Sequence, residues 1–149
     1  MIEAINLSIE SVKNGGGPFG AIIVKDNEII AKGSNNVTLL NDPTAHAEIV
    51  TIRQACLKLN NFDLSGCVIY SSCEPCPMCL GAIYWARISK VYFANTRIDA
   101  KNIGFDDSFI YDEIMLPYEK RKIPIYQLMR DKAQKAFKEW RAKEDKIDY

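Results

Sequence analysis

Four side chains in this sequence have the types and the spacing to hold and use a metal ion. His46 is the only histidine in the chain, and Glu48 follows it two residues later. Cys76 and Cys79 stand three residues apart, a spacing that puts both sulfurs on one face of a helix. An imidazole and two thiolates are ligands that Zn²⁺ prefers, and three protein ligands leave a fourth tetrahedral position open for water. These residues predict a catalytic metal centre.

Glu48 is the candidate general base of this centre. Two thiolates already cancel the charge of a divalent cation, so its bound water should be less acidic than water held by three neutral imidazoles. A nearby base is then needed to activate the water. The pattern of His-x-Glu followed by Pro-Cys-x-x-Cys is typical of zinc-dependent nucleobase deaminases. The alternative is that Glu48 is only an acidic residue in the first turn of a helix.

Cys73 offers a different set of ligands, because Cys73 and Cys76 also have the C-x-x-C spacing. A proline follows Cys73 by two residues, and the residue before a proline avoids the helical region, so we expect Cys73 at the end of a strand. A structural zinc with four ligands stays open as an alternative, although it leaves Glu48 without a role. Cys56 and Cys67 occupy apolar positions and are expected in the core.

Two helix starts must bring these residues together. Residues 41–44 are expected to open a helix that runs to about Asn60, with Asp42 or Thr44 as its cap. Residues two apart on a helix face different sides. His46 and Glu48 can therefore share a site only if they lie at the N-terminal end of that helix. Pro77 suits the first turn of a second helix, which should end near Ala86.

The other elements alternate between strands and helices. We expect helices at 2–13, 108–115 and 130–146, and strands at 21–24, 28–31, 66–71, 88–93 and 123–128. The last helix should turn Ala133, Ala136, Phe137 and Trp140 inward. This alternation predicts an α/β sandwich with helices on both faces of a sheet.

Composition narrows the class of protein. The 149 residues are a single-domain length, and 19 basic and 19 acidic residues give a formal charge of zero. A nucleic-acid partner usually requires a basic excess, so the balance favours a small substrate. The sequence contains no apolar run of membrane-spanning length and no basic, signal-like start. Cysteines three apart indicate a metal cluster in a reducing cytoplasm, so a cytoplasmic protein is expected.

Five segments of the chain carry a family resemblance, and they are 17–21, 35–37, 41–48, 72–87 and 104–109, which read GPFGA, NNV, NDPTAHAE, SCEPCPMCLGAIYWAR and GFDDSF. With these segments, almost the full length of the chain resembles the short bacterial guanine deaminases of the cytidine deaminase superfamily. The metal motif is shared by the whole superfamily, whereas residues 84–87 and 105–109 are more specific to the guanine branch.

The resemblance implies a cytidine-deaminase-like fold, a three-layer α/β/α sandwich around a five-stranded mixed sheet. It implies one zinc-dependent deaminase domain over residues 1–149, with one Zn²⁺ per subunit held by His46, Cys76 and Cys79. The activity would be hydrolysis of guanine to xanthine and ammonia in purine catabolism or salvage. A homodimer is also implied, in which the C-terminal segment from about residue 130 to 149 is exchanged and Tyr149 closes the partner's site.

The resemblance also assigns roles around the base. Asp107 would contact the amino group and act as a second proton shuttle beside Glu48, although Asp107 could instead cap the helix that begins at Ser108, and Asp106 is an alternative partner. Substrate contacts would come from Asn35, from the rings of Phe19 and Trp85, and from the backbone N–H of Ala47 at a helix start. Either aromatic ring could instead be a core residue, and Asn35 an ordinary turn former.

Other functions remain open at this stage. A tRNA adenosine deaminase and a cytosine or nucleoside deaminase share the same zinc chemistry. The basic residues in 120–122 and 141–143 lie among acids and resemble a solvated surface. A non-enzymatic, zinc-stabilised binding module is the alternative of a different class, in which replacing Glu48 would change stability alone.

Overall fold

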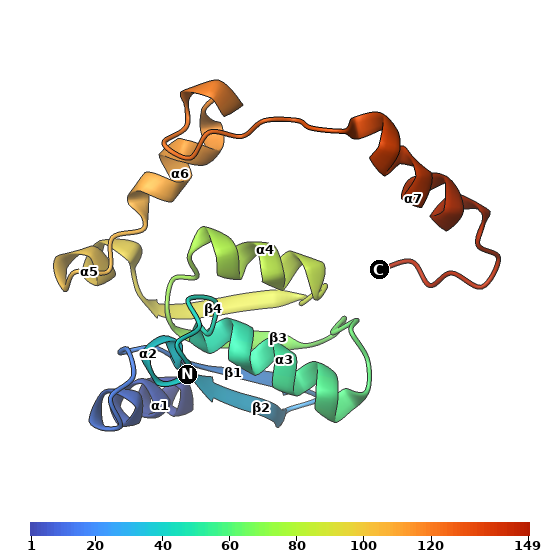
Figure 1. Ribbon diagram of the computed structural model, residues 1–149. Coiled ribbons are helices and arrows are strands. Elements are labelled where there is room, and N and C mark those ends of the chain that lie inside the picture. Colours follow the sequence, from blue (N-terminus) through green and yellow to red (C-terminus); the bar gives the residue numbers. More distant parts are fainter. The chain divides into compact units, whose positions relative to one another are not determined.

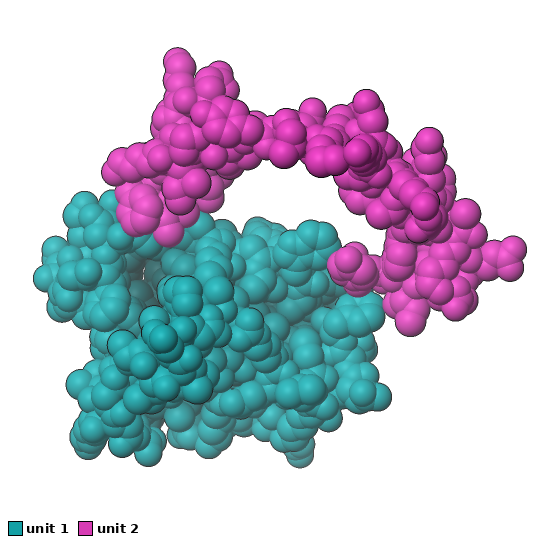
Figure 2. All heavy atoms as spheres, viewed as in Figure 1, with its two compact units in different colours: residues 1–108 teal, residues 109–149 magenta.

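The computed structural model describes residues 1–149 and divides into two compact units, Met1–Ser108 and Phe109–Tyr149 (Figure 2). The first unit contains a sheet and most of the helices (Figure 1). Its elements in chain order are α1 (Ile2–Lys13), β1 (Gly20–Lys25), β2 (Glu28–Ser34), α2 (Val37–Leu40), α3 (Ala47–Leu59), β3 (Val68–Cys73), α4 (Pro77–Trp85), β4 (Lys90–Asn95) and α5 (Arg97–Asn102).

The sheet has four strands in the order β2-β1-β3-β4. β1 pairs antiparallel with β2 and with β3, whereas β3 and β4 are parallel, so the sheet is mixed as predicted. The expected hairpin is confirmed, with Asp26 and Asn27 both at positive φ in its two-residue turn. The prediction of five strands is wrong, because residues 123–128 form no strand and β4 remains an edge.

Helices cover both faces of this sheet. Successive residues of a strand point to opposite faces. Gly20 lies so close to α1 that a Cβ there would be 2.4 Å from the carbonyl oxygen of Ala4. On the other face, Ile23 and Ile69 pack with Ile52 of α3 in the main apolar core. The α/β arrangement predicted from the alternation of elements is therefore present in the first unit.

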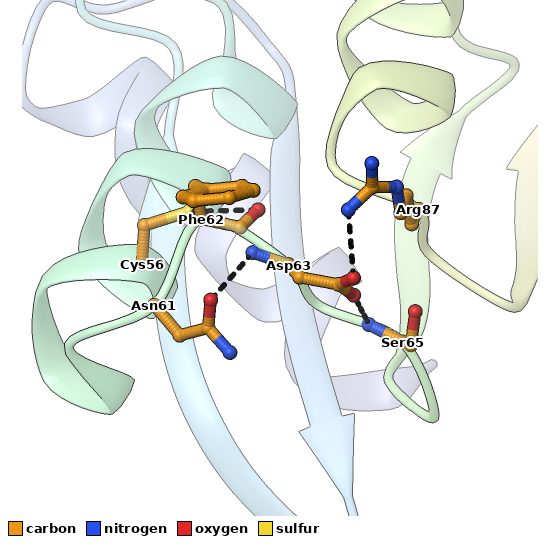
Figure 3. Close-up of polar contacts among 6 residues, drawn as sticks. All are labelled: Cys56, Asn61, Phe62, Asp63, Ser65 and Arg87. Carbon is orange, nitrogen blue, oxygen red and sulfur yellow. Dashed lines mark hydrogen bonds and ion pairs between the residues drawn. The ribbon is translucent and has the colours of Figure 1, made fainter. Parts of the chain in front are cut away.

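The C-terminal ends of α3 and α4 are tied together (Figure 3). Arg87 Nη1 lies 2.8 Å from Asp63 Oδ2, and the guanidinium is 6.0 Å from the centre of the Phe62 ring. The backbone N–H of Leu64 also donates to the carbonyl oxygen of Ala86 at 2.8 Å. Bonds from Ser65 and then from Arg87 lower the pKa of Asp63 to about 2. These contacts join the loop after α3 to the end of α4.

The second unit has helical elements only. α6 (Ser108–Met115) begins at the boundary, a 3₁₀ turn spans Tyr118–Lys120, and α7 covers Arg130–Ala142. The predicted inward face of α7 is wrong for this chain, because Phe137 and Trp140 are 71% and 42% exposed. A helix with an apolar stripe buries it only where another layer is available. No helix in the protein has the length and hydrophobicity needed to cross a membrane.

Candidate functional site

Two helix N-termini position the candidate metal ligands. His46 is the N-cap of α3 in an extended conformation, and Cys76 is the N-cap of α4 with Pro77 next in the chain. The expected end-on arrangement of His46 and Glu48 is therefore confirmed. The expected start of this helix at residues 41–44 is wrong, because Asp42 Oδ1 accepts the backbone N–H and the hydroxyl of Thr44 and forms a separate turn.

The imidazole nitrogen of His46 lies at the distance from each sulfur that a zinc ion requires. Nδ1 of His46 lies 3.6 Å from Sγ of Cys76 and 3.5 Å from Sγ of Cys79. A tetrahedral ion with bonds of about 2.3 Å to sulfur and about 2.1 Å to nitrogen would hold these atoms about 3.6 Å apart. All three atoms lie within 4.8 Å of one another. The structure thus brings together a group that could hold a metal.

The thiols of Cys76 and Cys79 are hydrogen-bonded to each other in this geometry. The hydrogen bond from Cys79, together with the His46 ring and the backbone N–H of Cys79, lowers the pKa of Cys76 to about 4. The same bond, reinforced by burial, raises the pKa of Cys79. The bond to Cys76 also raises the pKa of His46. One thiolate is therefore already favoured here, and the dipoles of two helix N-termini further support negative charge.

Glu48 lies beside the candidate ligands, and a residue of strand β3 holds its carboxylate in place. Its side chain is buried, Oε1 accepts a hydrogen bond from the Ser71 hydroxyl at 3.0 Å, and Oε2 accepts one from Cys79 at 3.4 Å. Burial raises the pKa of Glu48, and the bond from Ser71 opposes that shift. Ser71 was not predicted from the sequence, where its only signal is a hydroxyl in an otherwise buried strand, which must find a partner.

Cys73 is not part of the ligand group. It ends β3, as expected, and its Sγ lies 3.6 Å from the carbonyl oxygen of Thr96. Burial, followed by the charge of Glu48, raises the pKa of its thiol to about 11. A protonated thiol directed at a carbonyl is a poor ligand, because metals bind the thiolate. The geometry disfavours the four-ligand alternative.

The two neighbouring aspartates have different surroundings. Asp106 accepts hydrogen bonds from the backbone N–H and the hydroxyl of Ser108 and pairs with Lys101 at 3.0 Å. These bonds lower its pKa to about 2. Asp107 is half-buried, and burial and then the charge of Cys76 raise its pKa. Asp106 therefore makes the capping contacts, whereas Asp107 is near enough to the ligand group to sense its charge.

The residues expected around a base lie in the first unit, apart from Tyr149. Asn35 is 6% exposed, and Ala47 is fully buried as the first residue of α3, where backbone N–H groups have no partner inside the helix. Phe19 packs edge-to-face against Phe105, with ring centres 5.0 Å apart. Phe105 lies in the segment 104–109, and its pairing with Phe19 was not predicted from the sequence.

Trp85 and Tyr149 were also expected at the substrate. Trp85 is the last residue of α4 and is 69% exposed, whereas Cys76 precedes the first residue of that helix. Tyr149 is the C-terminal residue of the second unit and is 71% exposed. Their expected roles at the substrate stay predictions.

Residues 1–95 match the family model described as the zinc-binding region of cytidine and deoxycytidylate deaminases. The chain is 55% identical to the guanine deaminase of Bacillus subtilis (strain 168) over 148 residues, which cover 99% of this chain and 95% of the relative. An X-ray structure of guanine deaminase from Bacillus subtilis matches with a TM-score of 0.95 over 98% of this chain and 94% of that one. A tRNA-specific adenosine deaminase of Aquifex aeolicus (strain VF5) is 45% identical over 111 residues, 74% of this chain and 72% of the relative.

Proposed function

The chain belongs to the cytidine and deoxycytidylate deaminase family, and we propose that it hydrolyses guanine to xanthine and ammonia. The observation that carries this proposal is the 55% identity to a guanine deaminase over nearly the whole chain, combined with a His46, Cys76 and Cys79 group beside a buried Glu48. The predicted α/β fold of the cytidine deaminase type is consistent with a TM-score of 0.95.

One Zn²⁺ per subunit is the metal that suits this group, since the imidazole nitrogen lies at the separation from each of the two sulfurs that tetrahedral zinc requires. When bound, zinc lowers the pKa of a water molecule and so supplies a nucleophile near neutral pH. The helix N-termini that carry His46 and Cys76 keep the ligand atoms in place.

Glu48 moves the protons of the reaction. Its carboxylate accepts a proton from the attacking water and delivers it to a ring nitrogen next to carbon 2 of guanine. Ser71 holds Oε1 at 3.0 Å, which leaves Oε2 directed toward the ligand group. Because burial raises the pKa of Glu48, the carboxyl group is suited to both accepting and returning a proton.

Asp107, rather than Asp106, is the residue that contacts the leaving amino group. The capping contacts with Ser108 and the ion pair with Lys101 already occupy Asp106. The pKa of Asp107 is raised by burial and by Cys76, so this carboxyl group can carry the proton with which the amino group leaves as ammonia. Water adds to carbon 2, the amino group leaves as ammonia, and xanthine remains.

The base is held by residues around this centre. Asn35 contacts its edge, the backbone N–H of Ala47 donates to it, and Phe19, supported by Phe105, packs against the ring. Trp85 and Tyr149 complete the site, and Tyr149 belongs to the partner subunit. A purine base is therefore the partner molecule that this arrangement suits.

The protein forms a homodimer in which the segment from about residue 130 to 149 is exchanged between subunits of this one 149-residue deaminase domain. β4 is an unpaired edge with Tyr92 and Phe93 exposed, and α7 exposes Phe137 and Trp140. A second copy is the occupant that would cover these apolar surfaces. A protein ending at Arg130 should then be inactive and monomeric in light scattering, whereas an active dimer of that length would contradict the exchange.

The test of the activity is ammonia release by the purified protein from guanine, guanosine, adenine, cytosine and an adenosine-bearing tRNA anticodon loop. We expect guanine to be turned over and Glu48→Gln to lose activity by at least about a hundredfold while retaining zinc. Turnover of the tRNA loop alone would identify a tRNA adenosine deaminase, which a relative at 45% identity keeps as the second candidate. A Glu48→Gln variant with unchanged ammonia release would refute the mechanism.

We place this activity in the cytoplasm.

A further inference from the structure

Asn35 is anchored by three hydrogen bonds from separate parts of the chain. Its backbone N–H donates to the carbonyl oxygen of Phe19 at 3.0 Å, and its backbone carbonyl accepts from the Ser11 hydroxyl at 3.3 Å. Its side-chain Oδ1 accepts from the backbone N–H of Val37 at 3.3 Å. Ser11 and Asn35 are both buried. The position of Asn35 is therefore fixed along both its backbone and its side chain.

These bonds also determine which end of the amide is free. A backbone N–H can only donate, so the side-chain atom that faces Val37 must be the carbonyl oxygen. Nδ2 makes no hydrogen bond within the chain. Every fully buried side-chain nitrogen or oxygen has a partner, so Nδ2 of Asn35 is not completely buried. The anchored amide thus leaves its donor free for another acceptor.

Gly17 lies directly against this amide. A Cβ at Gly17 would be 3.0 Å from both Cγ and Oδ1 of Asn35, closer than real Cβ contacts normally come. Gly17 does not adopt a positive φ, so its backbone conformation does not require glycine. The three atoms nearest to the space that a missing side chain leaves at Gly17 all belong to the side chain of Asn35.

The anchored segment is also connected to the ligand group. The backbone N–H of Asn36 donates to the carbonyl oxygen of Ala45 at 2.9 Å, and Ala45 is the residue before His46. The amide of Asn35 is consequently held in a fixed relation to the start of α3, where the candidate metal ligand His46 and the base Glu48 lie.

We propose that Ser11 and Gly17 are positioning residues that hold the Asn35 amide as a hydrogen-bond donor, so that this side of the site selects a substrate atom that accepts a hydrogen bond. The inference rests on the proposed function, which puts Asn35 on the purine. In guanine the ring nitrogens without hydrogen and the carbonyl oxygen are acceptors, whereas the amino group is mainly a donor. Asn35 therefore orients the ring and does not contact the group that leaves.

A double-mutant cycle on guanine hydrolysis tests the positioning role. Asn35→Ala should raise KM about tenfold through loss of one hydrogen bond, with a smaller change in kcat. Gly17→Ala should raise KM about three- to tenfold, because its methyl group displaces the amide. The same Gly17→Ala change should have no further effect in the Asn35→Ala background, where Cγ and Oδ1 are gone. Zinc content and melting temperature serve as readouts independent of activity.

Three further variants test the polarity of the amide, provide a control and test Ser11. Asn35→Asp can still accept from Val37 but cannot donate, so its KM should rise at least as much as that of Asn35→Ala. Thr38→Val removes another hydroxyl bond to the same loop, from Oγ1 to the carbonyl oxygen of Gly15 at 2.9 Å, and should leave KM unchanged. Ser11→Ala should raise KM about two- to fivefold, and it replaces Gly17→Ala if that variant does not fold.

The outcomes distinguish the positioning role of Ser11 and Gly17 from the contact of Asn35 with the substrate. An unchanged KM in Asn35→Ala would remove Asn35 from the substrate and so contradict that part of the proposed function. A raised KM in Asn35→Ala with wild-type values in Gly17→Ala and Ser11→Ala would overturn the positioning role. An equal effect of Gly17→Ala with and without the Asn35 side chain would do the same. Full activity of Asn35→Asp would overturn the assignment of the amide as a donor.

Discussion

Replacing Ser71 with alanine should impair catalysis without removing the metal ligands. The Ser71 hydroxyl donates to Glu48 Oε1 at 3.0 Å, and the two residues are only 1% and 5% exposed, so water cannot readily replace the lost donor. A hydrogen bond to a charged group contributes about 1.5–3 kcal/mol. Since each 1.36 kcal/mol is a factor of ten in rate, kcat for guanine should fall about 10- to 150-fold.

The assay is steady-state ammonia release from guanine, with zinc content measured on the same samples. Ser71→Thr keeps a hydroxyl and should recover most of the lost kcat. Ser72→Ala is the matched control, because Ser72 is equally buried in the same strand but its Oγ accepts from the backbone N–H of Gly20 at 2.9 Å. That control should lose about 1 kcal/mol of folding stability and retain kcat.

Two results would refute the reasoning about Ser71. A Ser71→Ala protein with kcat within twofold of wild type would mean that Glu48 needs no support from β3. A loss of kcat that matches an equal loss of bound zinc would place the effect of Ser71 on metal retention instead of on the orientation of Glu48.

Three further predictions concern other parts of the molecule. Asp63→Asn should lower the melting temperature at pH 7. The folded pKa of Asp63 is about 2 against 3.8 for an unperturbed carboxyl, so the stability that Asp63 contributes is present above about pH 4 and lost toward pH 2, and the difference from wild type should shrink over that range in thermal melts. Dialysis against a zinc chelator should abolish ammonia release and lower the melting temperature, and Zn²⁺ should restore both; retained activity without zinc would contradict the metal assignment. Asp107→Asn should lower kcat about a hundredfold while Asp106→Asn retains it, and the reverse order in the same assay would exchange their roles.

Much of the candidate site could be predicted because its features are local in the sequence. The side chains that suit zinc are His46, Cys76 and Cys79, and helix geometry alone places Cys76 and Cys79 on one face. The same local rule required His46 and Glu48 to lie at a helix N-terminus, and His46 is the N-cap of α3. The assignment to the cytidine deaminase superfamily is confirmed by the family match.

Other features could not be predicted because they depend on contacts between distant residues. Ser71 meets Glu48 from 23 residues away, and the Ser11 hydroxyl meets Asn35 from 24 residues away. Sequence could not distinguish Asp106 from Asp107, because hydrogen bonds to Ser108 and the ion pair with Lys101 decide which carboxyl group is occupied.

The sequence by itself determined the chemistry of this protein, since residue type, short spacing and helix capping depend only on neighbouring residues. Tertiary structure decided the number of strands and whether the apolar face of α7 is buried. Residues 123–128 have the composition of a strand, yet a strand forms only against a partner edge, and none is available to them in the second unit. The orientation of Glu48 and Asn35 was decided in the same way, by side chains that folding brings to them from elsewhere in the chain.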